Sequence, residues 1–239
     1  MAYFNYNDKQ CYYNEIGDGT PLLFLHGNTA SSKMFNDIID FYKDEYKVIL
    51  IDFVGHGKSQ MVDKFSADLW FDEAMQVICF LEAMNYKKVN IIGSSGGALV
   101  ALNVALERPD LVNKVIADSF EGEVPLESFV QNVKIEREAS KQDDGAKAFY
   151  IYNQGENWEK VVDNDTEAIF EHYKTIGKFF HKPLETMQPE VLLTGSREDE
   201  FVSLISSDFF ENTFSLLLEK IKNGKMYLFD KGGRSEEHT

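Results

Sequence analysis

One stretch constrains the fold of this chain more than any other, the run from Val89 to Leu102. It starts with the mostly apolar Val-Asn-Ile-Ile, passes through Gly-Ser-Ser-Gly-Gly, and continues into an alanine- and leucine-rich segment. A short apolar run is typical of a buried parallel strand, and a segment that is apolar nearly all round is typical of a buried helix. We therefore expect a strand, a sharp turn and a helix, with Ser95 at the junction.

The turn spells G-x-S-x-G, with Gly93 and Gly97 on either side of Ser95. Glycines at these positions permit strained backbone geometry and close approach of the neighbouring chain, which leaves the serine hydroxyl accessible. Because a helix begins at once, the N–H of Gly96 becomes a donor for a developing oxyanion. The same motif also suits a small residue that caps a buried helix, so the rest of the chain decides between the two interpretations.

Strand-like and helix-like segments alternate along the rest of the chain. Alternating aromatic and polar residues predict an antiparallel hairpin over residues 2–17. Apolar runs predict buried strands at 21–25, 47–52, 112–117, 190–194 and 225–230, and amphipathic patterns predict helices at 31–42, 67–85 and 206–221. This alternation predicts an α/β fold with a mainly parallel sheet and helices on both of its faces.

Residues 120–188 differ from the sequence on either side of them. They form charged, aromatic-rich helical segments without a strand-like run. We therefore expect a core domain in two parts, residues 1–119 and 189–233, interrupted by a helical cap insertion at 120–188 that faces the carboxyl edge of the sheet. Most aromatic side chains of the insertion are expected to hold the cap together, and a minority to contact a substrate.

Composition excludes several classes of protein. Hydrophobic residues make up 44% of the 239, which excludes a disordered chain, and no apolar run reaches the roughly 18 residues of a membrane helix. A net charge of −16 argues against a nucleic-acid partner. The first residues lack a secretory signal, so a soluble, cytoplasmic protein is expected, with no prediction of its oligomeric state. Cys11 and Cys79 are expected to be free thiols, with Cys79 buried.

Four motifs occur in an order typical of one superfamily. They are Leu-Phe-Leu-His-Gly-Asn at 23–28, Asp-Phe-Val-Gly-His-Gly-Lys-Ser at 52–59, Gly-Ser-Ser-Gly-Gly at 93–97 and Leu-Leu-Thr-Gly-Ser-Arg-Glu-Asp-Glu-Phe-Val at 192–202. On these motifs the chain resembles the α/β-hydrolase superfamily over almost its whole length, which implies the α/β-hydrolase fold. Ligands of open parallel sheets bind beyond the carboxyl ends of the strands, so the four loops are expected to converge on one site.

The resemblance implies a division of roles among these loops. Ser95 is expected to be the nucleophile, and the backbone N–H groups of Asn28 and Gly96 are expected to hold the oxyanion. A histidine would take the proton of the serine, and a carboxylate would orient that histidine. The reaction needs no metal and no cofactor.

Three carboxylates are candidates for the acid. Asp199 is favoured, because it follows the strand that ends at 194–195 and is itself followed by Glu-Phe-Val, as in many relatives. Its neighbour Glu198 takes the role if the loop is in effect one residue shorter. Asp118 follows the preceding strand, where some relatives place their acid, and could otherwise be a helix or loop cap.

Two early histidines and one aspartate match superfamily positions that usually support loop structure. His26 and His56 are therefore expected to be structural residues and not the base of the triad. Asp52 is likewise expected to be a structural hydrogen-bonding residue.

The chain departs from the superfamily pattern after its last expected strand. The superfamily commonly runs Gly-Gly-His and then a terminal helix, whereas this chain reads Gly-Gly-Arg, with Arg234 in the place of the histidine. Residues 234–239 look like the translation of a sequencing-library adapter, so we interpret them as a non-native tail. His238 is the only late histidine, and no ordered packing is expected to hold it at the site. The chain as printed is thus expected to have little or no activity and one uncovered sheet face.

Together these features predict a serine hydrolase that acts on a small ester, thioester or related acyl substrate. The serine at the elbow argues against epoxide hydrolases and haloalkane dehalogenases, which use an aspartate there. Carbon–carbon bond hydrolases and cofactor-free haloperoxidases share the serine triad. The alternative from another class is a non-catalytic small-ligand binding protein of the same fold.

Overall fold

The computed structural model describes residues 2–200, 202, 205–206 and 208–233. These residues form a sheet in the order β1-β2-β4-β3-β5-β6-β7-β8. The strands are β1 (Ala2–Tyr6), β2 (Lys9–Ile16), β3 (Thr20–Leu25), β4 (Tyr46–Ile51), β5 (Val89–Ser94), β6 (Val112–Asp118), β7 (Glu190–Ser196) and β8 (Gly224–Phe229). β1 and β2 form the predicted antiparallel hairpin, and β2 is also antiparallel to β4. All other neighbours are parallel, which confirms the predicted sheet.

The central strands are buried because their side chains are apolar on both faces. In β3 every residue from Leu22 to Leu25 is buried, and in β4 every residue from Val48 to Ile51. Leu23 pairs with Ile49 on one side and with Ile91 on the other. Central strands of a parallel sheet need such continuous apolar runs. The strands were predicted from these runs.

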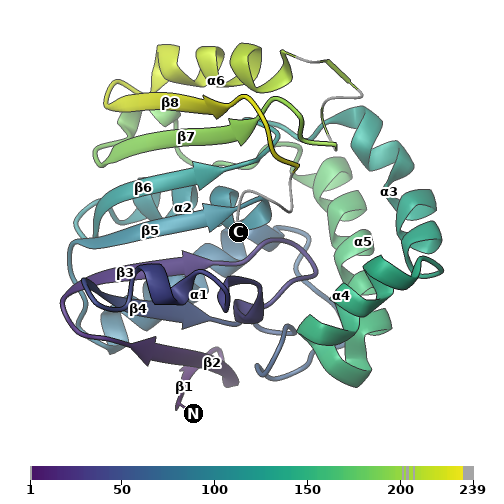
Figure 1. Ribbon diagram of the computed structural model, residues 1–239, viewed down its shortest axis with the longest axis horizontal. Helices are drawn as coiled ribbons and strands as arrows, with labels where there is room; N and C mark the ends of the chain where they lie inside the picture. The colour runs from purple at the N-terminus through teal and green to yellow at the C-terminus, as the bar shows by residue number, and fades with distance from the viewer. Residues whose placement is uncertain (1, 201, 203–204, 207, 234–239) are drawn as a thin grey trace.

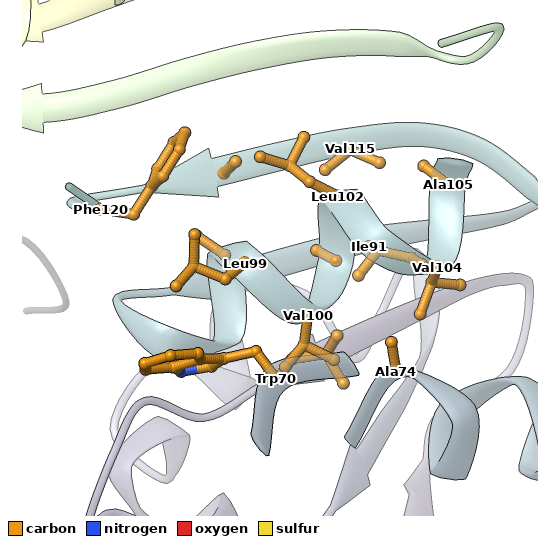
Figure 2. Close-up of a cluster of buried hydrophobic side chains, with 14 of the residues drawn as sticks. Trp70, Ala74, Ile91, Leu99, Val100, Leu102, Val104, Ala105, Val115 and Phe120 are labelled. Atoms are coloured by element: carbon orange, nitrogen blue, oxygen red, sulfur yellow. The ribbon is translucent and has the colours of Figure 1, made fainter. Parts of the chain in front are cut away.

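Two helices cover one face of the sheet, α1 (Leu69–Ala83) and α2 (Gly96–Glu107) (Figure 1). Both were predicted. In α2 every residue from Gly96 to Leu106 is buried. Within the core cluster, Leu102 lies toward Val115 of β6, and Val100 lies toward α1 (Figure 2). This packing makes α2 a rigid support for the turn that precedes it.

The helix predicted at 31–42 is wrong. The segment instead forms two short 3₁₀ helices, η1 (Ser32–Phe35) and η2 (Ile39–Phe41). Asn, Asp and Ile between them are poor helix formers. Phe35 and Ile39 are nevertheless buried with Phe24, so the apolar pattern identified the packing but not the backbone.

The cysteine prediction is half right. Cys11 and Cys79 are both free thiols, as predicted, and Cys11 is buried. Cys79 is only half-buried, because its inward-facing neighbours Ile78 and Phe80 turn it toward the edge hairpin, where its Sγ lies 3.5 Å from the carbonyl oxygen of Asn5.

Three helices lie beyond the carboxyl ends of the parallel strands: α3 (Glu127–Ser140), α4 (Asp144–Gln154) and α5 (Trp158–Thr175) (Figure 1). We call them the cap helices. A 3₁₀ turn, η3 (Gly155–Asn157), joins α4 to α5, and η4 (Leu184–Thr186) leads back to β7. The remaining helix, α6 (Phe209–Lys220), precedes β8. It matches the predicted helix at 206–221.

Buried amide side chains fasten α4 to the loops of the sheet. Gln154 donates from Nε2 to the carbonyl oxygens of Thr29, at 3.0 Å, and Ala30, at 2.6 Å. Its Oε1 accepts from the N–H of Gly57 at 2.6 Å. Asn153 accepts from the backbone N–H of Ser31 at 2.9 Å. These bonds give hydrogen-bond partners to buried polar groups of both α4 and the loops.

A groove of about 730 Å³ runs over the opposite face of the sheet. Ile92, Ile116 and Leu192 line it, and all three are only half-buried. No helix in the described part of the chain is both long and apolar enough to cross a membrane.

Candidate active site

Ser95 lies at the turn between β5 and α2 in a strained backbone conformation. Its φ is 55° and its ψ is −122°, outside the regions that residues with a side chain prefer. The backbone N–H of Ser95 donates to the carbonyl oxygen of Asp118 at 2.8 Å, which ties the turn to β6. Such strain costs on the order of 1–3 kcal/mol and persists only where the surroundings over-determine it.

Three glycines leave room for this turn. A β-carbon at Gly93 would collide with the carbonyl oxygen of Gly97, and one at Gly97 would collide with that of Leu25. A β-carbon at Gly27 would lie 3.0 Å from Cβ of Ser95 and 3.6 Å from its Oγ. The glycines that the sequence singled out, Gly93 and Gly97, are thus required by close packing of the backbone, and Gly27 places the loop after β3 beside Ser95.

Ser95 opens into a cavity of about 440 Å³ between the sheet and the cap helices. Asn28 and Gly96 line the same cavity. Within residues 2–200 and the other described positions, the backbone N–H groups of Asn28 and Gly96 donate to no acceptor. Two such N–H groups beside a serine are what an oxyanion hole requires.

The side chain of Asn28 joins a buried network that sequence analysis missed. Its Oδ1 accepts from Nε1 of Trp70 at 3.1 Å, and its Nδ2 donates to Asp165 of α5 at 2.5 Å. Asp165 also pairs with Nη2 of Arg137 of α3 at 3.0 Å. Burial raises the pKa of Asp165, although Arg137 and the hydrogen bond from Asn28 lower it. The only sequence signal was that Arg137 is the single arginine of residues 120–188.

The three candidate acids lie at the ends of neighbouring strands but in different settings. Asp199, after β7, is fully buried, whereas Glu198 is exposed and accepts from the N–H of Gly232 at 3.4 Å. Asp118, at the end of β6, accepts from Oγ1 of Thr194 at 2.7 Å and from Oγ of Ser94 at 3.4 Å. Asp118 thus bonds to side chains at the end of β5 and in β7, and the choice among the three carboxylates stays a prediction.

His26, His56 and Asp52 have the environments of structural residues. His26 accepts from the N–H of Phe53 at 3.2 Å, and its Nδ1 lies 2.9 Å from the carbonyl oxygen of Gly27. The ring of His56 stacks on Phe65 with centroids 4.8 Å apart. Asp52 accepts from the N–H groups of Ser32, at 2.7 Å, and Lys58, at 2.8 Å.

The cavity contains no histidine among the residues that the structure describes. His172 and His181, on and after α5, lie near Ala67 and Asp68 instead. Arg234 and His238, on which the sequence analysis of the chain end rests, lie outside the described residues.

Burial keeps His26 and His56 neutral, and this makes the folded protein sensitive to acid. Burial lowers the pKa of His26, and lowers that of His56 well below the ordinary value of 6.5. Below about pH 6.5 the unfolded chain therefore binds more protons than the folded chain, so stability present above that pH is lost as the pH falls. We expect the free energy of unfolding, measured by urea denaturation, to fall between about pH 7 and about pH 5.

The variant His56→Gln isolates this effect, because it has one titratable ring fewer and keeps the other ionisable groups. Its fall in stability over the same pH range is expected to be smaller than that of the unaltered chain. Parallel pH profiles for the two proteins would contradict the assignment.

Comparisons with known proteins identify relatives of the chain. The sequence model of the alpha/beta hydrolase fold family matches residues 20–173. Over 110 residues the chain is 31% identical to (E)-2-((N-methylformamido)methylene)succinate hydrolase of Acinetobacter baylyi, a match that spans 46% of this chain and 41% of that protein. Over 223 residues, 83% of this chain and 78% of the relative, it is 26% identical to 2-hydroxy-6-oxo-6-phenylhexa-2,4-dienoate hydrolase of Comamonas testosteroni.

A solved structure from work on carboxylesterases of the ammonia-oxidizing thaumarchaeon Nitrososphaera gargenis has the same fold. It superposes with a TM-score of 0.76 at 16% identity and covers 98% of this chain and 91% of that one. At this identity the likeness concerns the path of the chain and not its chemistry.

Proposed function

The chain belongs to the α/β-hydrolase fold family, and from that premise we propose that it is a serine hydrolase of small esters or related acyl compounds. One observation carries the proposal. Ser95 is held in a strained turn that opens into a cavity, and Asn28 and Gly96, whose N–H groups donate to no acceptor among the described residues, line the same cavity. Strain of this kind is retained where it serves a function. The two curated relatives, both named as hydrolases of small organic acids, support hydrolysis of a small molecule here.

In the proposed reaction Oγ of Ser95 attacks the carbonyl carbon of the substrate. The carbonyl oxygen becomes an oxyanion and accepts hydrogen bonds from the N–H groups of Asn28 and Gly96. A histidine takes the proton of the serine and passes it to the leaving alcohol as the carbon–oxygen bond breaks. Water then attacks the acyl-enzyme with the same histidine as base, which releases the acid and restores the serine. Asp199 orients the histidine.

We also propose that, in the source gene, the codon after that of Gly233 encodes this histidine. Residues 234–239 of the printed chain would then come from a sequencing adapter. Gly232 supports this, because its carbonyl oxygen accepts from Oγ of Ser196 at the end of β7, and its N–H lies 3.4 Å from Glu198. The chain at Gly232 is therefore beside the loop that carries Asp199. Resequencing the gene across codons 231–239 from a flanking primer tests this, and a genuine arginine codon followed by the printed tail would overturn it.

The cap helices are the proposed source of substrate selection. Residues 120–188 would form an insertion into a core made of 1–119 and 189–233. The cavity supports this division, because its walls come from both parts: Leu99 from the core, and Phe129, Tyr150 and Ile169 from the cap helices.

Labelling with a fluorophosphonate tests the hydrolase proposal directly. In the full chain encoded by the resequenced gene, we expect one adduct, found by mass spectrometry on the peptide that contains Ser95. Heat denaturation before labelling should abolish it, because only the folded turn activates the serine. If a chain that carries the histidine takes no label, the alternative of a non-catalytic small-ligand binding protein replaces the hydrolase.

A further inference from the structure

The side-chain amide of Asn28 is held from two sides, by one helix of the core and one of the cap. Its Oδ1 accepts from Nε1 of Trp70 on α1, and its Nδ2 donates to Asp165 on α5. An indole N–H can only donate and a carboxylate can only accept, so the amide fits these partners in one orientation. Turned over, it would set two donors against each other and two acceptors against each other. The side chain of Asn28 is therefore fixed up to its end.

The backbone that follows Asn28 is strained. Thr29 has a φ of 60°, in the left-handed region that β-branched residues avoid. Its Oγ1 donates to the carbonyl oxygen of Asn28 at 2.6 Å, and its own carbonyl oxygen accepts from Gln154 of α4. Strain of this kind persists only where the surroundings over-determine it. The N–H of Asn28 thus keeps its direction because the bonds of its side chain and of the following residue hold the loop.

The anchored amide also lies against the second oxyanion donor. A β-carbon at Gly96 would collide with Oδ1 of Asn28 and would lie 2.8 Å from Nε1 of Trp70. The side chain of Asn28 therefore packs directly on the first residue of α2. This contact fixes the loop after β3 relative to the turn that carries Ser95.

Asp165 acts from behind the cavity wall. It is fully buried and is not among the described residues that line the cavity, whereas Asn28 is. Its second oxygen pairs with Nη2 of Arg137 at 3.0 Å. This pair offsets the negative charge of Asp165, which would otherwise disfavour an oxyanion nearby. The carboxylate can therefore hold Asn28 without touching a substrate.

We propose that Asp165 is a positioning residue, which acts through the side-chain amide of Asn28 to aim the backbone N–H of that residue at the oxyanion formed on Ser95. This deepens the proposed hydrolase function, on which it rests. It gives a cap helix a part in the chemistry, because an acceptor on α5 sets the direction of a donor on the core. A displaced oxyanion donor lowers the rate of reaction more than it weakens substrate binding.

A double-mutant cycle between Asp165→Ala and Asn28→Ala tests this in the full chain encoded by the resequenced gene. Asn28→Ala removes the anchored side chain and keeps the backbone N–H. Each single variant is expected to lower kcat for 4-nitrophenyl acetate by about tenfold to a hundredfold and to leave KM within about threefold. The double variant is expected to be no slower than the slower single variant, because both changes break the same link. An unchanged kcat, a change confined to KM, or effects that multiply in the double variant overturns the proposal.

A second background covers the case in which Asp165→Ala does not fold, since that change leaves Arg137 without its partner. In this background Arg137→Met and Asp165→Leu replace the whole ion pair. Exchanging a buried pair for apolar side chains of similar volume is often neutral for stability. Here Asn28→Ala is expected to change kcat by less than about threefold, and a further loss of about tenfold contradicts the proposal.

Thr166→Ala is the matched control. Thr166 is the next residue of α5, is buried, and donates to the carbonyl oxygen of Val162 in the same helix. It is not among the described residues that line the cavity, so kcat is expected to stay within about threefold. A loss equal to that of Asp165→Ala shows that a weakened α5, and not the bond to Asn28, is the cause.

Labelling of Ser95 by the fluorophosphonate separates this inference from the function on which it rests. A full chain that takes no label defeats the proposed function and this inference with it. A chain that is labelled, but whose kcat is unmoved by both Asp165→Ala and Asn28→Ala, defeats this inference alone.

Discussion

In the full chain encoded by the resequenced gene, replacing Ser95 with alanine is expected to lower the hydrolysis of 4-nitrophenyl acetate by about a thousandfold or more. The side chain that forms the acyl-enzyme would be gone, and the two N–H groups of the cavity would supply only the residual catalysis of an oxyanion hole. The backbone of the turn is held by Gly93, Gly97 and the bond to Asp118, so the variant should still fold. Steady-state kinetics and far-UV circular dichroism measure the two quantities.

Ser94→Ala is the matched control for this variant. Ser94 is the preceding residue, is buried at the end of β5, and contacts Asp118 at 3.4 Å. Its hydroxyl bonds to Asp118 and Ser94 does not line the cavity, so activity is expected to stay within about tenfold of the unaltered full chain. If hydrolysis survives Ser95→Ala but is lost in Ser94→Ala, Ser94 and not Ser95 is the nucleophile, and the proposal is wrong.

The second large effect is expected on stability, from Gly97→Ala. A β-carbon there would collide with the carbonyl oxygen of Leu25 and lie 2.7 Å from that of His26. Both oxygens belong to the backbone at the end of β3, which cannot turn away as a flexible side chain could. We expect the free energy of unfolding, measured by urea denaturation, to fall by about 3 kcal/mol.

Gly145→Ala separates this collision from helix propensity. Gly145 is the second residue of α4, as Gly97 is of α2, and its β-carbon would meet only the side chain of Asp143 at 3.3 Å. Alanine favours a helix by about 1 kcal/mol over glycine, so this variant should be unchanged or slightly more stable. A loss of stability equal to that of Gly97→Ala would mean that the packing of the turn is not the cause.

The sequence predicted those parts of the molecule whose signals are local. Ser95 sits in a five-residue motif between an apolar strand and an apolar helix, and each of these can be recognised within its own window. The mainly parallel sheet followed from the alternation of such windows. The 3₁₀ helices near Phe35 could not be distinguished from an α-helix, because both place the same apolar residues against the sheet.

The network behind Asn28 had no local signal. Asn28 and Asp165 lie 137 residues apart, and Arg137 and Asp165 lie on different helices. Asparagine, aspartate and arginine side chains are most often solvated surface groups, in loops as well as on amphipathic helices. Only the folding of the cap helices onto the sheet brings them together, so sequence analysis assigned Asn28 a backbone role and left its side chain without one.

The attachment of α4 also determines how the molecule comes apart. Asn153 and Gln154 bond to backbone groups of Thr29, Ala30 and Ser31, so lifting α4 would leave buried donors and acceptors unpaired on both sides of the contact. Local opening is cheapest where few buried groups are broken. We therefore expect the amides of α4 to exchange with solvent deuterium as slowly as those of β3, because the helix and the strand melt as one cooperative unit.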